Sequence, residues 1–283
     1  MSKSIEIVTT IVDLRAAVAE WRMKNLSVGS VPTMGALHEG HFSLVKRSVA
    51  ANDRTCVTLF VNPKQFGSGE DFEIYPRNQE ADAQALGVHQ ADLLFAPTIE
   101  EMYPDRFVTR VSVQGIGDLL EGEFRPGFFD GVATVVSKLL IQSLPDRAYF
   151  GEKDYQQLCV IRQMAADLDL PVEIIGCPIV REEDSLAVSS RNAYLTAEQR
   201  VVAPALYRIL KETAEWAQSS GAIGDAIVAA RNALLKAGFT KVDYVAICDP
   251  VSLEPVEKIS SLVRVLGAAW LESTRLIDNV EII

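Results

Sequence analysis

Short apolar runs alternate with amphipathic stretches over the first half of the chain. The apolar runs predict buried strands, because parallel strands covered on both faces read as nearly continuous hydrophobic segments. The stretches between them repeat apolar residues at helical spacing. We expect strands at Ser27–Val31, Thr55–Val61, Asp92–Ala96, Ala148–Phe150 and Val172–Ile175, and helices at Gly40–Asn52, Asn78–Leu86, Gly131–Ser143 and Tyr155–Asp169. This alternation is typical of an α/β fold, a Rossmann-like doubly wound parallel sheet.

The pattern changes after about Pro178. One long amphipathic helix is expected after the cap-like Thr196, and a second over Ile223–Ala237, ended by Gly238. Three β-like runs then follow at Lys241–Cys248, Leu262–Trp270 and Arg275–Glu281. Helices followed by consecutive strands predict a smaller α+β domain with an antiparallel sheet. The expected division is a Rossmann-like domain over residues 1–178 and a C-terminal α+β lid domain over residues 179–283, packed closely together.

Composition narrows the class of protein. The net charge is −11, from 27 basic and 38 acidic residues, and so acidic a surface disfavours a nucleic-acid partner. No apolar run approaches the roughly 20 residues of a membrane span, and the N-terminus lacks the apolar core of a signal peptide. The four cysteines form no CxxC pair and are expected to be buried, reduced thiols. We interpret this composition as that of a cytoplasmic enzyme with no membrane partner.

The stretch HEGH holds two of the three histidines of the chain, His38 and His41. Their spacing of three excludes the HExxH zinc motif, which needs four. They follow a predicted strand and precede a predicted helix, so they lie at a helix N-terminus, where free N–H groups and the helix dipole favour an anion. Gly40 lets a flat ring approach the backbone. The motif predicts a phosphate site; on HEGH alone, two surface histidines without a ligand remain the alternative.

Three further loops fall at strand ends on the same side of the predicted sheet. Gln65 follows the second strand, in a segment that could also be a simple Asn-Pro turn. Asp154 and Gln157 have the spacing of a capping box, and Lys153 beside them can reach a phosphate. The Ser189–Arg191 segment offers two hydroxyls and a guanidinium to a triphosphate or a carboxylate. The chain has no P-loop, GxGxxG or GxSxG motif.

Taken in order, the segments PTMGALHEGH, FVNPKQF, DFEIYPR, PDRAYFGEKDYQQL and SSRNAYL resemble the pantoate–β-alanine ligase (pantothenate synthetase) family, of the HxGH nucleotidylyltransferase superfamily. The resemblance covers about Val31 to Arg200. It implies ATP-dependent condensation of (R)-pantoate with β-alanine to pantothenate, with release of AMP and diphosphate through an enzyme-bound pantoyl adenylate. This reaction belongs to pantothenate and coenzyme A biosynthesis. The resemblance also implies Mg²⁺ as cofactor with ATP, and a homodimer.

The resemblance assigns roles to residues of this chain. It implies ATP contacts from Met34, Gly35, Ala36, Leu37, His38, Glu39, Gly40, His41, Gly151, Glu152, Lys153, Asp154, Val180, Val188, Ser189, Ser190 and Arg191. Gln65 and Gln157 would bind pantoate, and Gln65 also β-alanine. His41 would have the acid role, with His38, Lys153, Ser189 and Arg191 as further catalytic groups. Asp82 matches another polar position of the site. No residue is expected to hold a metal, since Mg²⁺ would bridge the ATP phosphates.

Two positions depart from the family pattern. Phe128 stands where histidine is usual, and no catalytic role is expected for it. Ser185 replaces a usual glycine, so it could strain a turn that needs a positive φ. Neither position supplies a phosphate donor, so activity is still expected. The small and acidic residues of Gly67–Tyr75 suggest a loop that closes over the intermediate.

Three other classes of protein share part of this pattern. Other HxGH nucleotidylyltransferases generally lack the GEKDxQQL helix start and the paired glutamines. Class I aminoacyl-tRNA synthetases need a KMSKS-like loop and a basic surface. A non-catalytic nucleotide sensor would have lost at least one phosphate-handling residue, yet His38, His41, Lys153 and Arg191 are all present. An enzyme is therefore favoured.

Overall fold

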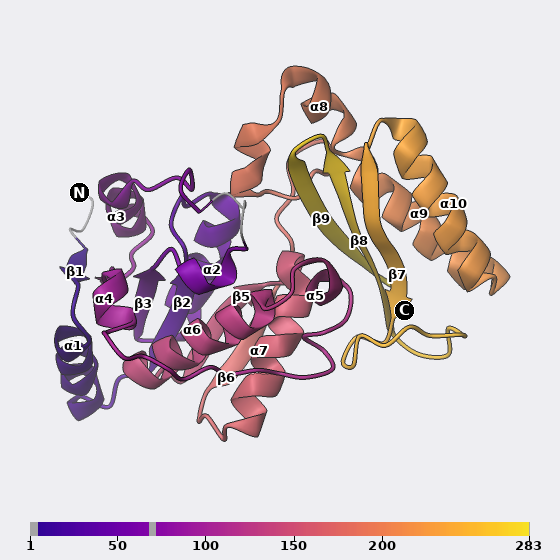
Figure 1. Cartoon of the computed structure of the whole chain (residues 1–283). Helices are drawn as coiled ribbons and strands as arrows, with labels where there is room; N and C mark the ends of the chain where they lie inside the picture. Colours follow the sequence, from indigo (N-terminus) through magenta and orange to yellow (C-terminus); the bar gives the residue numbers. More distant parts are fainter. Residues whose placement is uncertain (1–4, 68–71, 283) are drawn as a thin grey trace.

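The chain folds around a parallel sheet flanked by a smaller antiparallel one (Figure 1). A computed structural model describes residues 5–67 and 72–282. The parallel sheet has the order β1-β4-β3-β2-β5-β6, with every pairing parallel. Its strands are β1 (Glu6–Val8), β2 (Val28–Thr33), β3 (Arg54–Leu59), β4 (Leu93–Phe95), β5 (Arg147–Gly151) and β6 (Glu173–Cys177). The predicted α/β fold with a doubly wound parallel sheet is confirmed.

Helices cover both faces of this sheet. They are α1 (Ile11–Met23), α2 (Glu39–Ala51), α3 (Gln79–Val88), α4 (Ile99–Met102), α5 (Glu121–Phe124), α6 (Phe128–Ser143) and α7 (Tyr155–Asp167), with 3₁₀ turns η1 (Pro63–Gln65) and η2 (Glu152–Asp154). Helices α1, α6 and α7 pack with Cys56 and Phe150 on one face. Helices α2 and α3 pack with Val57 and Tyr149 on the other. Neighbouring strand residues thus point to opposite layers, as the strand period requires.

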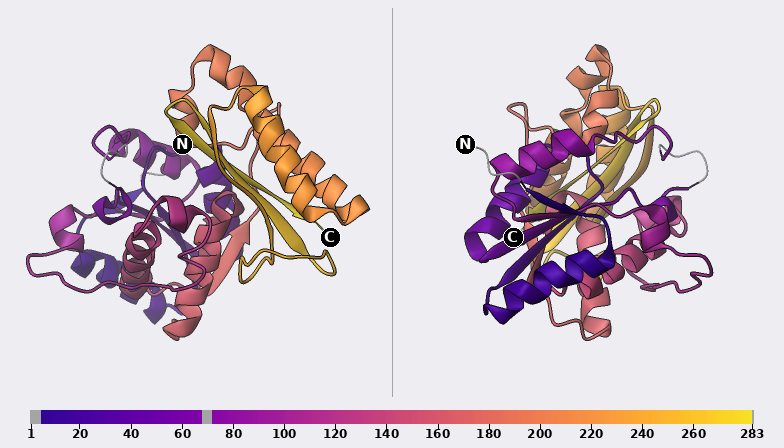
Figure 2. Two further views of the ribbon diagram at one scale, coloured as in Figure 1. Left: turned by 45° about the vertical axis from the view of Figure 1, so that its right-hand side comes forward. Right: turned by 90° about the vertical axis from the view of Figure 1, so that its left-hand side faces the viewer.

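The antiparallel unit follows. After η3 (Ser190–Tyr194) it contains α8 (Ala197–Val202), α9 (Ala205–Ser220), α10 (Ile223–Ala237), β7 (Lys241–Cys248), β8 (Val263–Leu271) and β9 (Thr274–Ile282). The strands pair in the order β7-β8-β9. Helices α9 and α10 lie on the outer face of the sheet, and its other face turns toward the parallel unit (Figure 2). This confirms the predicted smaller α+β unit; the boundary at residues 178 and 179 stays a prediction.

The inner face of the small sheet joins the core of the parallel unit. Tyr244 and Leu266 belong to the same apolar cluster as Phe129 of α6 and Leu158 of α7. Burial of this shared surface is the main favourable contribution to the contact between the two units. The cleft between them is therefore bounded by side chains from both.

Several expectations were wrong. The sequence reading missed β1 and α1 near the N-terminus, and the short helices α4 and α5. The single long helix expected after Thr196 is divided into α8 and α9 around Pro204, because proline provides no N–H for a continuous helix. Asp154 makes no side-chain capping bond to α7, because the chain enters that helix through the 3₁₀ turn η2. In the suggested closing loop, residues 68–71 lie outside the described residues.

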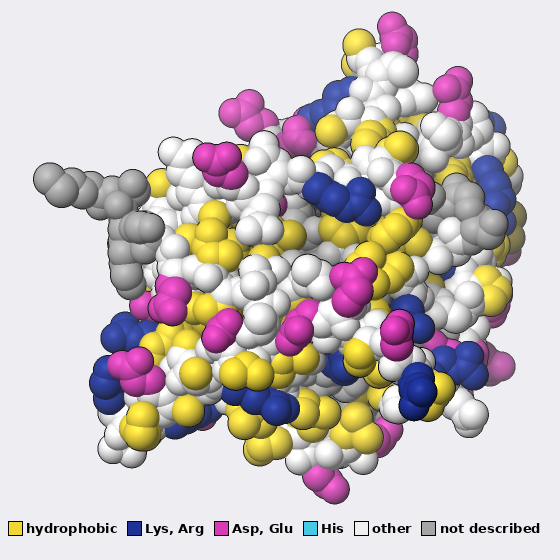
Figure 3. Space-filling view, turned by 60° about the vertical axis from the view of Figure 1, so that its left-hand side comes forward, with side chains coloured by type: hydrophobic (Ala, Val, Ile, Leu, Met, Phe, Trp, Pro, Cys, Tyr) yellow, Lys and Arg dark blue, Asp and Glu magenta, His cyan; other side chains and the backbone are white. Residues whose placement is uncertain are grey.

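The four cysteines are free and buried. Burial raises the pKa of the Cys159 thiol to about 11 and those of Cys56 and Cys248 to about 12. A thiol with so high a pKa is a poor nucleophile at neutral pH. In the described part of the chain, no helix is both long and apolar enough to cross a membrane. One face of the molecule interleaves acidic and basic side chains with apolar ones (Figure 3).

Candidate active site

The strand order reverses between β2 and β5. These two strands are neighbours, yet the chain continues from β2 to β3 on one side and from β5 to β6 on the other. In open α/β sheets such a reversal leaves a crevice at the carboxyl ends of the strands, where ligands bind. Here β2 ends at Thr33 and β5 at Gly151, so the loops beyond Thr33 and Gly151 face each other across the crevice.

Both histidines of HEGH lie in the first turn of α2. His38 is the N-cap residue, and its Nδ1 accepts the Gly40 backbone N–H at 3.2 Å. The His41 Nδ1 accepts the His38 backbone N–H at 3.4 Å. Each Nδ1 is therefore an unprotonated acceptor, so the neutral rings carry their proton on Nε2. The ring centroids are 4.1 Å apart.

The electrostatic surroundings keep these imidazoles neutral. Burial is the main cause that lowers the pKa of His41 to about 3, and repulsion from His38, when that ring is protonated, and from Lys153 adds to it. Burial is also the main cause that lowers the pKa of His38, with Lys153 adding to it. At neutral pH both rings therefore act as uncharged Nε2–H donors that retain affinity for an anion.

The loop between β2 and α2 is held in place from α3. The buried Asp82 carboxylate accepts backbone N–H groups from Ala36 at 3.0 Å and Leu37 at 2.9 Å. Ala36 has a φ of 51°, so the anchor supports a strained backbone. Asp82 thus positions the loop. Within the loop, a Cβ on Gly40 would lie 2.9 Å from His38 Cε1, which explains the glycine beside the ring.

Gln65 is buried at the end of η1. Its Nε2 lies 2.8 Å from Met34 Sδ, and its Oε1 accepts from Asn62 Nδ2 at 3.0 Å. Asn62 is itself fixed by the hydroxyl of Tyr103, which donates to Asn62 Oδ1 at 2.8 Å. This chain of contacts gives the Gln65 amide one orientation. The sequence reading did not identify Asn62 and Tyr103 as its supports.

The loop after β5 carries Lys153. Its ammonium lies 3.5 Å from Asp154 Oδ1. From β9, Asn279 Nδ2 donates to the carbonyl oxygens of Glu152 at 2.8 Å and Lys153 at 3.2 Å. The loop that presents the lysine is therefore fixed by the antiparallel unit.

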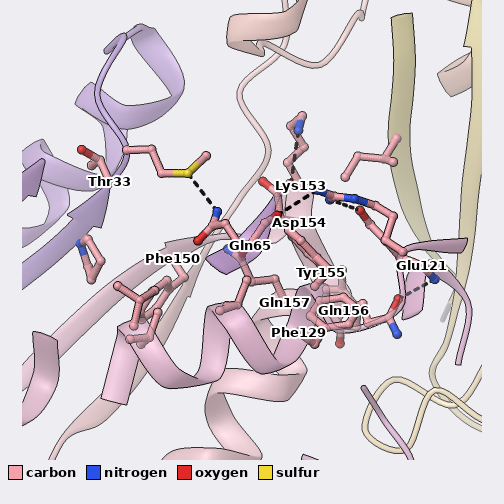
Figure 4. Close-up of a pocket in the computed structure, with 18 of the residues that line it drawn as sticks. Thr33, Gln65, Glu121, Phe129, Phe150, Lys153, Asp154, Tyr155, Gln156 and Gln157 are labelled. Carbon is pink, nitrogen blue, oxygen red and sulfur yellow. Dashed lines mark hydrogen bonds and ion pairs between the residues drawn. The ribbon is translucent and has the colours of Figure 1, made fainter. Parts of the chain in front are cut away.

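Two cavities occupy the crevice, and His41, Lys153 and Gln157 border both. One, of about 110 Å³, has in its wall the predicted site residues His38, Gly40, His41, Gly151, Lys153, Asp154, Gln157, Val180 and Val188. The other, of about 200 Å³, is bordered by Met34, His41, Gln65, Lys153, Asp154, Gln157 and Arg191, together with an apolar wall from α6. Gln65 and Gln157 lie in the same part of this second cavity (Figure 4).

Some predicted residues stand apart from these two cavities. Gly35, Ala36, Leu37, Glu39, Glu152, Ser189 and Ser190 line neither, although Ser189 borders a small neighbouring cavity with Lys153 and Arg191. The structure adds residues that the sequence reading missed, namely Glu121, Arg125, Asp278 and Asn279. In β9, the adjacent polar residues Asp278 and Asn279, between Ile277 and Val280, were the available signal.

Comparison with known proteins decides the family. A model of the family described as pantoate-beta-alanine ligase matches residues 6–281. The chain belongs to this family. It is therefore an enzyme, a ligase. A protein called pantothenate synthetase from Paramagnetospirillum magneticum is 55% identical over 280 residues, 99% of each chain. The corresponding protein of Caulobacter vibrioides is 53% identical over 281 residues, 98% of each chain.

Solved structures agree with this family. The pantothenate synthetase of Thermus thermophilus superposes with a TM-score of 0.92 at 48% identity, covering 98% of this chain and 99% of that one. The pantoate-beta-alanine ligase of Francisella tularensis, crystallised with beta-gamma ATP and beta-alanine, superposes with a TM-score of 0.83 at 34% identity, covering 98% and 97%. The arrangement of both sheets is therefore that of the family.

Proposed function

We propose that this ligase forms pantothenate in two steps that share one site. In the first, a carboxylate oxygen of (R)-pantoate attacks the α-phosphorus of ATP, the bond from that phosphorus to the bridging oxygen breaks, and diphosphate leaves. In the second, the amine of β-alanine attacks the acyl carbon of the pantoyl adenylate, the acyl–oxygen bond breaks, and AMP leaves as the amine loses a proton. The observation that carries the proposal is that the HEGH loop, Lys153 and the two glutamines line two cavities with a shared wall.

The nucleotide is assigned to the 110 Å³ cavity. Val180 and Val188 offer an apolar border for the base and sugar, and Gly151 allows the chain after β5 to come close. The phosphates then extend toward His38, His41 and Lys153, at the N-terminus of α2, where backbone N–H groups add to the attraction. Ser189 and Arg191 approach from the side of the antiparallel unit.

Pantoate is assigned to Gln65 and Gln157, in the 200 Å³ cavity. Neutral amides orient its carboxylate without a full counter-charge. A bidentate guanidinium would stabilise the ground state of the nucleophile and slow its attack. The apolar wall from α6 suits the methyl groups of pantoate and excludes water, which would hydrolyse the adenylate.

Charge stabilisation supplies most of the catalysis in this scheme. Negative charge spreads over the phosphate oxygens as diphosphate departs, and preorganised donors stabilise it without reorganisation. His41 donates from Nε2, and the charge of the bound triphosphate raises its pKa toward values at which it can pass a proton to the leaving group. Lys153 and Arg191 provide fixed positive charge.

Mg²⁺ is assigned to the phosphates of ATP. No group of three His, Cys, Asp or Glu residues that could hold a metal occurs within residues 5–67 and 72–282. When bound, the ion neutralises phosphate charge and orients the leaving diphosphate. The homodimer and the cytoplasmic location stay predictions that rest on the resemblance and on sequence composition.

Release of diphosphate and AMP from Mg·ATP tests the scheme. With pantoate alone we expect a single-turnover burst of diphosphate, and steady turnover only once β-alanine is added. Pantoate labelled with ¹⁸O in its carboxylate should transfer one label to AMP, because the attacking oxygen remains on phosphorus when the acyl–oxygen bond breaks. An unlabelled AMP would rule out the adenylate. ATP binding with no product under any condition would favour the nucleotide-sensor alternative.

A further inference from the structure

A short hairpin, residues 180–188, forms one wall of the 110 Å³ cavity. Val180 and Val188 stand at its base and border the cavity, and the Val188 N–H donates to the Val180 carbonyl oxygen at 3.0 Å. Further backbone groups pair between its two arms. A Cβ on Gly40 would lie 3.9 Å from the Val188 carbonyl oxygen. The base of the hairpin therefore lies against the HEGH loop.

Arg181 attaches the base of this hairpin to the antiparallel unit. Its Nη1 and Nη2 donate to the two carboxylate oxygens of Asp278 in β9, at 2.7 and 2.8 Å. Its guanidinium carbon lies 3.7 Å from the ring centroid of Tyr207 in α9. The same Nη1 donates to the Ser185 carbonyl oxygen at 3.0 Å. A bidentate pair that is also stacked on an aromatic ring fixes the orientation of the arginine side chain.

This attachment is buried, whereas a second one is open to solvent. The side chains of Arg181 and Asp278 are 19% and 3% exposed. Nearer the turn of the hairpin, Arg200 of α8 pairs with Glu182 and Asp184, and these three side chains are 33%, 37% and 43% exposed. Exposed ion pairs contribute little to stability, because water and salt screen them. The Arg181–Asp278 pair is therefore the stronger of the two attachments.

Different units thus hold the two walls of the 110 Å³ cavity. Asp82 of α3 anchors the HEGH loop through the Ala36 and Leu37 N–H groups. Arg181 holds the opposite wall on β9. Neither anchor borders the cavity itself. The width of the cavity depends on both anchors, because a shift of either wall changes its distance from a ligand held between them.

We propose that Arg181 is a positioning residue for the nucleotide, because its pair with Asp278 holds Val180 and Val188 at the distance from the HEGH loop that ATP requires. This inference rests on the proposed function, which assigns the nucleotide to this cavity. The antiparallel unit then contributes to the affinity for ATP through a side chain outside the cavity wall. Arg181 also neutralises Asp278, which borders the 200 Å³ cavity and would repel the phosphates if it were unpaired.

Binding of an ATP analogue tests the assignment. The probe is the Mg²⁺ complex of α,β-methylene-ATP, which cannot release diphosphate, and calorimetry measures its Kd. Arg181→Met/Asp278→Asn removes the pair without leaving a buried charge, and we expect the Kd to rise about 20-fold, within the range typical of coupling between separate sites. The KM for pantoate should stay within about twofold, because the hairpin does not hold Gln65 or Gln157. Arg181→Lys keeps the charge without the fork, so its Kd should rise about fivefold.

Matched variants separate position from charge and from folding. Arg200→Met removes the exposed attachment, and its Kd should stay within about twofold of the unaltered value. A normal Kd in the double variant, with weak binding only in Arg181→Met, would mean that unpaired Asp278 repels the phosphates, and it would overturn the positioning role. Equal rises in the Kd for the analogue and the KM for pantoate would overturn it in favour of a general structural role.

The unaltered protein distinguishes failure of this inference from failure of the proposed function. If it does not bind the analogue, the assignment of the nucleotide to this cavity fails, and the proposed function fails with it. If it binds the analogue and the double variant binds equally well, only the role of Arg181 is overturned.

Discussion

Asn279 and Lys153 are joined across the two units, since Asn279 Nδ2 donates to the Lys153 carbonyl oxygen at 3.2 Å while the same amide reaches Glu152 at 2.8 Å. Asn279 Oδ1 also accepts from Arg264 Nη1 at 2.7 Å. A residue of the C-terminal sheet thus fixes the backbone that presents a lysine of the first unit.

Replacing Asn279 should therefore slow the first step. Asn279→Ala leaves two carbonyls and a buried guanidinium without this partner, so we expect a loss of about 2 kcal/mol in the free energy of unfolding. Displacement of Lys153 should lower the rate of diphosphate release about tenfold. Asn279→Asp keeps the acceptor for Arg264 but replaces the donor with a carboxylate oxygen that faces two carbonyl oxygens, so it should be equally slow. Denaturant unfolding and single-turnover kinetics measure the two effects, and a normal rate in both variants would contradict the positioning role.

The neutral state of His41 predicts sensitivity to acid. Its pKa is about 3 in the folded protein, against about 6.5 in an unfolded chain. Between these two pKa values the unfolded chain binds a proton at this ring and the folded chain does not. The free energy of unfolding therefore falls as the pH falls through this window. His41→Gln should reduce this loss by about 1 kcal/mol between about pH 6 and pH 5. His89→Gln, on a ring stacked against Phe42, serves as the control. Parallel pH profiles for His41→Gln and the unaltered protein would show that the ring is not kept neutral.

Asp82 is expected to control ATP binding from outside the cavity. Asp82→Ala removes both acceptors from the Ala36 and Leu37 N–H groups, and we expect a loss of about 2 kcal/mol in stability together with a several-fold rise in KM for ATP. Asp82→Asn keeps one acceptor. Its stability and its KM for ATP should therefore lie between those of the unaltered protein and of Asp82→Ala. Thermal unfolding and initial rates at varied ATP would check this. A normal KM for ATP in Asp82→Ala would show that the loop keeps its shape without the anchor.

Ser185 has a φ of 74°, in the left-handed region. The sequence suggested this strain from a serine at a position where glycine is usual, and the backbone conformation confirms it. Ser185→Gly removes the strain but adds freedom to the unfolded chain, so a net gain of about 0.5 kcal/mol is expected. The Ser185 N–H bond to Glu182 and the Arg181 contact to its carbonyl use backbone atoms that glycine retains. Urea unfolding of the variant measures the change, and a loss of stability would mean that the hydroxyl makes a contribution of its own.

What the sequence could predict was local. HEGH placed both imidazoles at a helix start, because capping depends on residues a few positions apart. The alternation of strands and helices likewise follows from neighbouring residues. The Arg125–Glu121–Arg275 network was out of reach, since it joins α5 to β9 through contacts that no spacing encodes. Spacing alone also failed at Asp154, which has a φ of −93° and a ψ of 60° instead of extended backbone and makes no side-chain capping bond.

The core that Tyr244 and Leu266 share with α6 and α7 has a consequence for the integrity of the molecule. A protease cut in the connection after β6 would sever the peptide and leave most of the apolar contact intact. The two fragments should then stay together as a noncovalent complex and melt in one transition. The enzyme would then unfold as a single cooperative unit. Its cooperativity would depend less on the continuity of the chain than on the apolar surface that the two units bury against each other.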